Sequence, residues 1–477
     1  MLQSIDKFIT WFDGVVWGLP LIILILCTGI YLTLSMGFLQ VRHLGKALKF
    51  MLKNEEGGKG EVSSFGALCT AMSATIGTGN IVGVATALAA GGPGALFWMV
   101  VAAFFGMATK YAEGVLAIKY RTIDKDGHVL GGPFYYIENG MGVQWKWLAK
   151  IFAFFGAGVG LLGIGTFTQV NGISSAVCNF FDPEKLHTVS LLGRDYSIAT
   201  VVAGLCLTVF VGLVVIGGLK RIAKVSEIVV PFMAVLYFVF ALIIIVTHIT
   251  ELPAAVVTIV KSAFTGSALA GGAAGTMIVA MQKGIARGIF SNEAGLGSAP
   301  IAAAAAQTHS TVRQGLVSMT GTFIDTIIIC SMTGLTIVMT GTWNTGLEGV
   351  AITTAAFQKG LPFPPAVASL VLMVCLVFFA FTTILGWNYY GERCIEYLFN
   401  RNQKVVKGYR WLYILAIFIG PYMTVQAVWN IADIFNALMA FPNLIALIVL
   451  SRVVVAETKA FFGKEKKEVT ANKSCTE

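Results

Sequence analysis

The sequence predicts an all-α, polytopic membrane protein with about 11 transmembrane helices; ten form two inverted repeats of five, and one extra helix precedes them. Three observations support this prediction. Of the 477 residues, 56% are hydrophobic and only 12% are charged, whereas soluble domains have about a quarter charged residues. Long uncharged segments recur along the chain. Two of these segments, five apart in order, are interrupted by glycine and polar residues.

The predicted spans are apolar segments long enough to cross about 30 Å of hydrocarbon as helices. The first lies between Asp13 and Arg42, where no charged residue occurs. It is too long for the apolar core of a signal peptide and lacks a cleavage pattern, so we expect it to remain in the protein. The predicted spans are residues 15–37, 64–89, 95–118, 150–178, 198–216, 227–247, 265–288, 315–340, 366–392, 411–426 and 430–452.

The chain has a net charge of +9, and its basic residues are concentrated on one side of the predicted membrane. Alternate loops and the C-terminal tail are rich in lysine and arginine, whereas the intervening segments hold only Lys7, Lys185, Arg194, Lys261 and Lys359. The positive-inside rule places the richer side in the cytoplasm, with the N-terminus outside a plasma membrane and the C-terminus inside. The charge therefore indicates contact with membrane lipid and not a nucleic-acid partner.

The first interrupted segment contains "ATIGTGNIVG" at residues 74–83. Each glycine weakens a helix by about 1 kcal/mol relative to alanine. Gly79 and Gly83 form a GxxxG pair, which is a common helix-packing face in membranes. Packing accounts for the glycines but not for the polar residues Thr75, Thr78 and Asn80 around them, so we also expect a broken helix.

The second interrupted segment repeats this pattern at residues 267–288, with Gly271, Gly272 and Gly275 followed by Thr276. Broken helices at matching positions of two inverted halves indicate the central site of a secondary transporter. Unwound backbone leaves N–H and C=O groups without partners, which is costly unless a polar ligand lies there. The N–H groups at a half-helix start suit a carboxylate, and the freed carbonyls suit a cation.

These patterns divide the chain into four consecutive regions. The first is an N-terminal transmembrane helix with a basic cytoplasmic loop, residues 1–60. The two five-helix repeats follow at residues 61–250 and 251–456. A basic cytoplasmic tail, residues 457–477, ends the chain.

Four long motifs are "GTGNIVGVATALAAGGPGALFWM" (77–99), "GGPFYYIENG" (131–140), "RGIFSNEAGLGSAP" (287–300) and "TTILGWNYYGE" (382–392). They resemble the sodium:alanine symporter family, also called alanine or glycine:cation symporters. The resemblance runs from the first span to the last, and implies a leucine-transporter-like fold. It also implies a symporter, not an enzyme, that takes up small neutral amino acids such as alanine and glycine with sodium as coupling cation.

The resemblance assigns roles to residues of the first break. Thr78 and Gly79 are expected to bind the substrate carboxylate through backbone N–H groups. Asn80 offers a carbonyl to a cation or an amide to the carboxylate, and both roles stay open. Gly271, Gly272, Gly275 and Thr276 are expected to supply the second broken helix of the substrate site.

A sodium site in this fold takes carbonyls from the first core helix and hydroxyls from the eighth. Here the hydroxyls are those of Thr382 and Thr383, and the carbonyls lie near Ser73 and Ile76. The alternative is that both hydroxyls bond to carbonyls one turn earlier, as threonine commonly does in membrane helices.

Two further residues have equally weighted alternatives. Trp387 lies one turn after Thr383, where it either walls the substrate pocket or packs between helices. Gln169 is a buried amide that needs a partner. That partner is either the substrate or an adjacent helix.

Charges within the spans are functional candidates because they are costly there. Asp325 either binds a cation, carries a proton or pairs with Lys283 or Arg287. Lys110 and Glu113 are three residues apart on one span and are expected to pair with each other. Glu293 is a weaker candidate for a gate at the cytoplasmic mouth.

Other functional classes lack support in the sequence. It contains no HExxH or GxSxG motif, and its eight cysteines show no metal-ligand spacing. We therefore expect no cofactor and no structural metal. A channel would need a charged pore ring or oligomeric symmetry, and no feature predicts an oligomeric state. Proton-coupled uptake, and uptake of serine or glutamine, remain alternatives.

Overall fold

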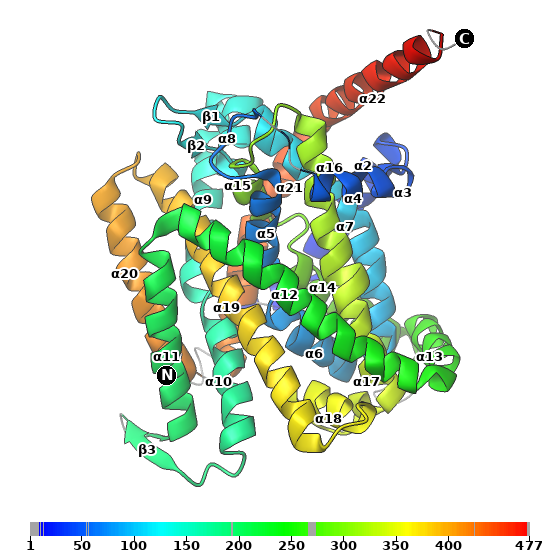
Figure 1. The fold of residues 1–477 in the computed structure, drawn as a ribbon, viewed down its shortest axis with the longest axis vertical. Helices are drawn as coiled ribbons and strands as arrows, with labels where there is room; N and C mark the ends of the chain where they lie inside the picture. The colour runs from blue at the N-terminus through cyan, green and yellow to red at the C-terminus, as the bar shows by residue number, and fades with distance from the viewer. Residues whose placement is uncertain are drawn as a thin grey trace.

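The structure, a computed structural model, describes residues 9, 11–12, 14–53, 55, 57–191, 194–265, 273–423 and 425–474. Helices dominate this part of the chain (Figure 1). The longer ones are α2 (Leu19–Ser35), α5 (Ser64–Thr75), α7 (Gly94–Lys119), α9 (Lys146–Leu162), α10 (Phe167–Phe181), α11 (Ile198–Val215), α12 (Gly218–Thr247), α13 (Leu252–Phe264), α14 (Ala273–Asn292), α16 (Thr311–Thr322), α18 (Val350–Gly360), α19 (Pro365–Leu398), α20 (Gln403–Ile419), α21 (Val425–Val449) and α22 (Ser451–Ser474).

Shorter helices and two antiparallel strand pairs connect these elements. The short helices are α3 (Leu39–Arg42), α4 (Leu44–Leu52), α6 (Val84–Gly91), α8 (Pro133–Tyr136), α15 (Ala299–Ala303) and α17 (Ser331–Thr340). Two wider helical turns of the π type, η1 (Gly79–Gly83) and η5 (Phe323–Cys330), lead into α6 and α17. The strand pairs are β1 (Thr122–Ile123) with β2 (Val129–Leu130), and β3 (Thr188–Leu191) with β4 (Arg194–Ser197).

Polar residues cap the starts of several helices. Ser63 accepts a hydrogen bond from the backbone N–H of Gly66 at the start of α5, over 2.8 Å. Asn402 caps α20 in the same way through Lys404. Such caps satisfy N–H groups that have no partner within the helix, so they fix where each helix begins.

Eight helical segments are long and apolar enough to cross a membrane, or nine when the bent pair α5 and η1–α6 is taken as one span. The expected count of 11 is therefore not reached among the described residues. Two predicted spans account for the difference. The segment at 411–426 lies only partly in α20, which ends at Ile419 and is 17 residues long. The segment at 265–288 is described as a helix only from Ala273 and carries Lys283 and Arg287.

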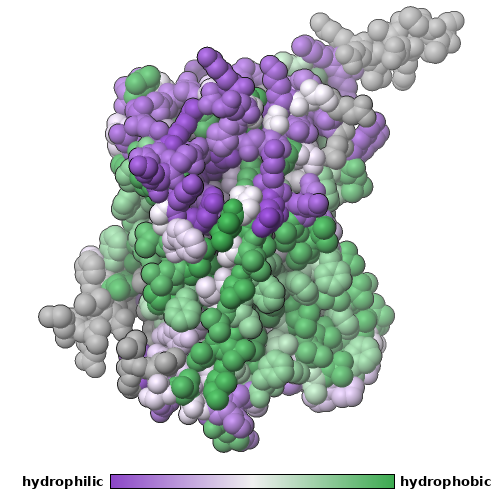
Figure 2. Space-filling view, turned by 60° about the vertical axis from the view of Figure 1, so that its left-hand side comes forward, coloured by the Kyte–Doolittle hydropathy of each residue, from purple (hydrophilic) through white to green (hydrophobic). Residues whose placement is uncertain are grey.

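The surface agrees with a multi-pass membrane protein. Figure 2 shows hydrophobic residues over most of one face and hydrophilic residues gathered at one end. Helix α11 illustrates the apolar surface, because its exposed large side chains include Val202, Leu205, Val209 and Phe210. Exposed apolar side chains in such a band are stable when they face hydrocarbon.

We call the hydrophilic end the basic end; β1–β2, α8, α15 and the start of α22 lie there (Figure 1). A charge cluster joins the β1–β2 hairpin to α19. His128 contacts Glu396 at 2.9 Å and Glu61 at 3.2 Å. Arg393 bonds to both carboxylates. Hydrogen bonds to Glu396 and Glu61 raise the pKa of His128 to about 9 although burial and Arg393 act against this.

Candidate functional site

The chain breaks its helix at the place that the glycine pattern predicts. Helix α5 ends at Thr75, η1 begins at Gly79, and the two half-helices meet at an angle of 51°. We call the residues between them, Ile76, Gly77 and Thr78, the break; all three are buried. A break inside a membrane protein frees backbone donors and acceptors that need other partners.

Two side-chain amides hold the freed N–H groups. The N–H of Gly77 donates to Asn80 Oδ1 over 2.8 Å. The N–H of Thr78 donates to Gln169 Oε1 on α10 over 3.0 Å. Among the described residues the buried hydroxyl of Thr78 has no hydrogen-bond partner. The break therefore has two backbone N–H groups bonded to side-chain amides and one hydroxyl, that of Thr78, without a hydrogen bond among the described residues.

Gly79, which follows the break, packs against Phe290 and Ser291 of α14.

Gly77 lies where the broken helix closely approaches α10 and α19. A Cβ atom there would lie 2.5 Å from Thr383 Oγ1 on α19 and 2.9 Å from Gln169 Oε1 on α10. Any larger residue would push apart these helices or displace both side chains. Glycine is required at this position because of close approach and not because of its backbone angles.

The freed carbonyl of Ile76 faces α19. Thr383 Oγ1 lies 3.2 Å from Ile76 O and also bonds to Phe379 O one turn earlier at 3.0 Å. Two oxygens at this separation, one carbonyl and one hydroxyl, are suited to bind the same hard cation. The Thr383 hydroxyl thus contacts both the break and a carbonyl of its own helix, so the alternative role, bonding one turn back, is also present.

The other predicted cation ligands lie differently. Thr382 donates to the carbonyls of Phe378 and Phe379 and also contacts the sulfur of Met233 on α12. Ser73 donates to Thr70 O within α5. Both side chains are buried. Of the two threonines, Thr383 is the one that contacts the break.

Asn80 connects the break to Asp325. Its Nδ2–H group donates to Asp325 Oδ1 over 2.7 Å, while its Oδ1 accepts from Gly77. Asp325 Oδ2 accepts from Ser291 at 2.9 Å and from Thr326 at 2.6 Å. Three donors around one fully buried carboxyl group are typical of a stabilised carboxylate. Ser291 and Thr326 were not singled out from the sequence, although Ser291 lies within the 287–300 motif.

Trp387 lies one turn beyond Thr383 toward the basic end. Its indole N–H donates to Glu293 Oε1 over 2.8 Å, and both side chains are fully buried. Glu293 itself has a left-handed backbone with φ of 56° and also accepts from Ser298. A non-glycine residue in this conformation costs energy and is held by its surroundings.

The proposed ion partners of the charged residues are corrected by the structure. Arg287 forms a two-pronged bond with Asp433 of α21, at 3.2 and 2.9 Å, and not with Asp325. Lys110 makes no salt bridge with Glu113 in the described part of the chain; there Glu113 Oε1 accepts from Asn443 and Gly295, and its Oε2 has no hydrogen-bond partner. The rotation of each helix about its axis decides which partners a side chain meets. Spacing along one helix does not reveal that rotation.

Lys110 is nevertheless central. Its buried ammonium group has no hydrogen-bond partner among the described residues. Glu113, Glu293 and Asp325 are fully buried carboxyl groups, so this part of the protein holds both a buried cation and buried acidic groups. Such groups are costly inside a membrane and are functional candidates.

The predicted second break is only partly covered. Gly271 and Gly272 lie outside the described residues. Gly275 and Thr276 fall in the first turn of α14, but their side chains also lie outside the described part. Within the described residues no three histidine, cysteine or acidic side chains are arranged to hold a metal ion.

Comparison with known proteins gives a consistent result. Residues 2–475 match the sodium:alanine symporter family. An uncharacterized transporter of Haemophilus influenzae is 53% identical, covering 97% of this chain and 98% of its own. The sodium/alanine symporter AgcS of Methanococcus maripaludis is 48% identical, covering 96% of this chain and 97% of its own.

The fold also has a counterpart among solved structures. The crystal structure of MhsT in complex with L-phenylalanine superimposes with a TM-score of 0.56, covering 84% of this chain and 99% of that chain. Its sequence identity is 13%, so the likeness concerns the fold alone. The fold is thus leucine-transporter-like.

Proposed function

Because the chain belongs to the sodium:alanine symporter family, we propose that it takes up small neutral amino acids, alanine and glycine first, by sodium-coupled alternating access. One observation carries this proposal beyond the family: the break places two backbone N–H groups, bonded only to side-chain amides, and the unpartnered Thr78 hydroxyl next to a carbonyl–hydroxyl pair. The first group suits an amino-acid carboxylate and the second suits sodium. The plasma membrane is the proposed location, with the basic end in the cytoplasm.

The substrate carboxylate is proposed to take over the N–H groups of the break. The amide oxygens of Asn80 and Gln169 accept from Gly77 and Thr78. A carboxylate oxygen is a stronger acceptor than an amide oxygen, so it displaces them. The Thr78 hydroxyl supplies a further donor. Displaced Gln169 Oε1 is then available to the substrate ammonium group.

Sodium is proposed to bind between Ile76 O and Thr383 Oγ1, with Ser73 and Thr382 as nearby candidates. A cation there holds α5 against α19 and so fixes the geometry of the break that binds the carboxylate. Binding at adjacent sites on one structural element couples the two ligands, and this coupling is reciprocal. Gly275 and Thr276 remain proposed contributors from the second broken helix.

Selection for small substrates is proposed to come from Trp387. The residue lies one turn from Thr383 on the basic-end side, and its indole is fixed by Glu293. A fixed ring leaves less room for a large substrate side chain than a mobile one.

The experiment is uptake of labelled alanine into proteoliposomes with an imposed sodium gradient, compared with a potassium gradient of equal size. Accumulation that follows sodium and saturates with alanine supports the proposal. Equal accumulation in potassium would exclude sodium coupling, and alanine-independent sodium flux would indicate a channel.

Proton coupling is the second candidate, and one observation favours it. Asp325 and Glu293 are fully buried carboxyl groups; Asp325 accepts from Asn80 beside the break, and Glu293 accepts from Trp387. Buried carboxyl groups beside a transport site are suited to exchange a proton. A pH gradient without sodium should then drive alanine uptake in the same proteoliposomes. An uptake that needs sodium at every pH would exclude this candidate.

A further inference from the structure

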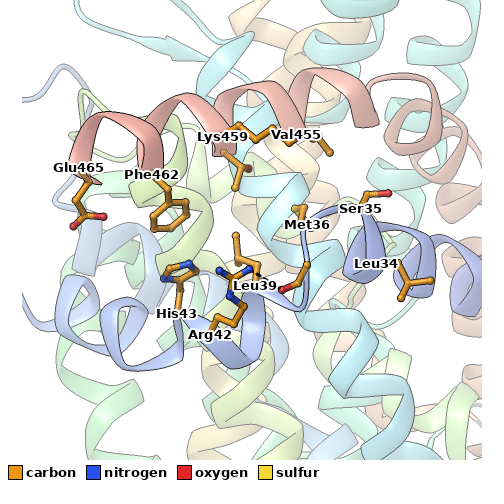
Figure 3. Close-up of a pocket in the computed structure, with 12 residues that line it drawn as sticks. Leu34, Ser35, Met36, Leu39, Arg42, His43, Val455, Lys459, Phe462 and Glu465 are labelled. Carbon is orange, nitrogen blue, oxygen red and sulfur yellow. Dashed lines mark hydrogen bonds between the residues drawn. The ribbon is translucent and has the colours of Figure 1, made fainter. Parts of the chain in front are cut away.

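A cavity of about 730 Å³ lies at the basic end, between the N-terminal helices α2–α4 and the C-terminal helix α22. Figure 3 shows His43 and Arg42 on one side and Phe462 and Lys459 on the other. It is far along the chain from the break and shares no lining residue with it. The proposed transport site therefore does not account for it.

The C-terminal wall of this cavity is anchored. Thr458 and Tyr111 of α7 share a hydrogen bond of 2.7 Å between their hydroxyl groups. Glu457 accepts from Lys119 of α7 and from Thr311 of α16, each at 2.8 Å. The position of this part of α22 is thus fixed by side chains from two other helices.

Charge in and around the cavity is predominantly positive. Arg42 and Lys459 line it and are exposed, whereas the acidic residue Glu465 is already paired with Lys46. Burial, with Lys46 and Arg42 nearby, lowers the pKa of His43. Its ring is therefore uncharged at neutral pH and stacks on Phe462 with 4.0 Å between the centroids. Two cations remain without a paired carboxylate among the described residues.

The opposite rim of the cavity is apolar and exposed. Leu34, at the end of α2, is 61% exposed and lines the cavity, and Phe38 and Val41 beside it are 45% and 61% exposed. Helix α2 belongs to a membrane-spanning segment that ends at Ser35. The change from apolar rim to basic lining therefore occurs where hydrocarbon gives way to lipid headgroups.

We infer that this cavity binds an anionic phospholipid of the adjacent leaflet, with its phosphate on Arg42 and Lys459 and an acyl chain along Leu34. Basic pockets at the ends of membrane helices are suited to anionic headgroups, and arginine matches phosphate geometry. The volume is within the range of sites for small ligands. A soluble phosphate would satisfy the cations but would leave the exposed apolar rim without a function.

The test is native mass spectrometry of the purified full chain with phosphatidylglycerol or phosphatidylcholine added in equal amounts. The variant is R42Q/K459Q, and the matched control is K49Q/R452Q. The control removes the same charge from the same end, at exposed residues that do not line the cavity. We expect wild type and control to retain one phosphatidylglycerol that the variant binds roughly tenfold more weakly.

A second measurement does not depend on variants. A phosphatidylglycerol with a photoreactive acyl chain, activated in vesicles with the wild-type protein, should label peptides that contain residues 34–43. Equal binding of the two lipids, equal loss in both double variants, or labelling spread over the whole apolar surface would overturn the inference. Displacement of the retained lipid by inorganic phosphate at comparable concentration would assign the site to a soluble anion instead.

Discussion

The indole N–H of Trp387 is bonded to Glu293 Oε1 across 2.8 Å, and this bond ties α19 to the turn after α14. We expect Trp387→Phe to lower Tm. The phenyl ring keeps most of the packing but leaves a buried carboxyl oxygen without its donor, which costs about 1–3 kcal/mol. Glu293→Gln should cost less, because an uncharged amide still accepts the indole bond. Thermal unfolding in detergent measures both changes.

Tyr389→Phe is the matched control for this pair. It removes a hydroxyl from the same helix whose bond to Ile301 O is long, at 3.5 Å. The double variant W387F/E293Q should be less destabilised than the sum of the single variants, since the two residues interact directly. Strict additivity would show that the bond is not significant in the folded protein.

Asn80→Asp should abolish uptake at neutral pH. The new carboxylate would lie at the 2.7 Å distance that separates Asn80 Nδ2 from Asp325 Oδ1, and like charges at that range in a buried site repel strongly. The swapped double variant N80D/D325N restores one amide and one carboxylate, so it should fold and recover part of the binding. Uptake at the wild-type rate by the single variant would mean that Asn80 lies away from the site during transport.

Thr383→Val should raise the sodium concentration needed for half-maximal alanine binding. Valine keeps the shape of threonine but removes the oxygen that lies 3.2 Å from Ile76 O. At saturating sodium, alanine affinity should largely recover, because the N–H groups of the break are unchanged. Thr382→Val tests the neighbouring candidate; because that hydroxyl contacts Met233 and not the break, its sodium midpoint should move less than that of Thr383→Val. An unchanged sodium midpoint in the first variant would move the search for the cation site to Asp325.

Gly77→Ala should abolish binding of both ligands, because its Cβ would lie 2.5 Å from Thr383 Oγ1. Real Cβ atoms do not approach that closely, so the break or α19 must shift. Gly83→Ala is the matched control: no atom lies within 4 Å of a Cβ there, and alanine favours the helix by about 1 kcal/mol. Calorimetric binding of alanine in sodium separates the two. Normal binding by Gly77→Ala would contradict the close packing of α5, α10 and α19.

His128 predicts a pH dependence of stability. Its pKa is raised from 6.5 to about 9 in the folded protein, chiefly by Glu396 and Glu61. A raised pKa gives a stabilisation that is complete below the unfolded value and is lost as pH rises through about 9. Relative to His128→Gln, wild type should therefore have a higher Tm near pH 6 and lose that advantage by about pH 10. Partial exposure to solvent reduces the effect.

A control for the pH series is available at the other end of the molecule. His187 is exposed and lies 3.8 Å from Asp182. Because this side chain is exposed and lies outside the cluster, His187→Gln should change Tm less than His128→Gln across the range. A parallel shift in both variants would show that the pH effect does not come from the cluster at Glu396.

The position of the break could be predicted because several glycine and polar residues close together in a long apolar segment disfavour a continuous helix. The leucine-transporter-like fold followed from the motifs. The contacts around the break could not be predicted, because they join distant parts of the chain. Asn80 and Asp325 are 245 residues apart, and Trp387 and Glu293 are 94 apart. These pairings depend on how each helix is rotated about its axis.

The same limit applies to the charged residues. Spacing along one helix suggests Glu113 as the partner of Lys110, and depth in the membrane makes Arg287 one possible partner of Asp325. In the structure Arg287 bonds to Asp433 on α21. The amide of Asn443, also on α21, donates a hydrogen bond to Glu113 Oε1. Both partners come from α21, which is far from Arg287 and Glu113 along the chain.

The two amide oxygens at the break bear on whether the protein can return empty after releasing its substrate. Gln169 and Asn80 lie where they satisfy the N–H groups of Thr78 and Gly77 whenever no carboxylate does so. An empty carrier whose backbone is satisfied in this way has no hydrogen-bond penalty when it closes and returns for the next molecule. A carrier without such alternative acceptors would change its open side only with substrate bound. It would therefore exchange one amino acid for another. If the substrate carboxylate binds at the break as we propose, this geometry favours net accumulation over obligatory exchange.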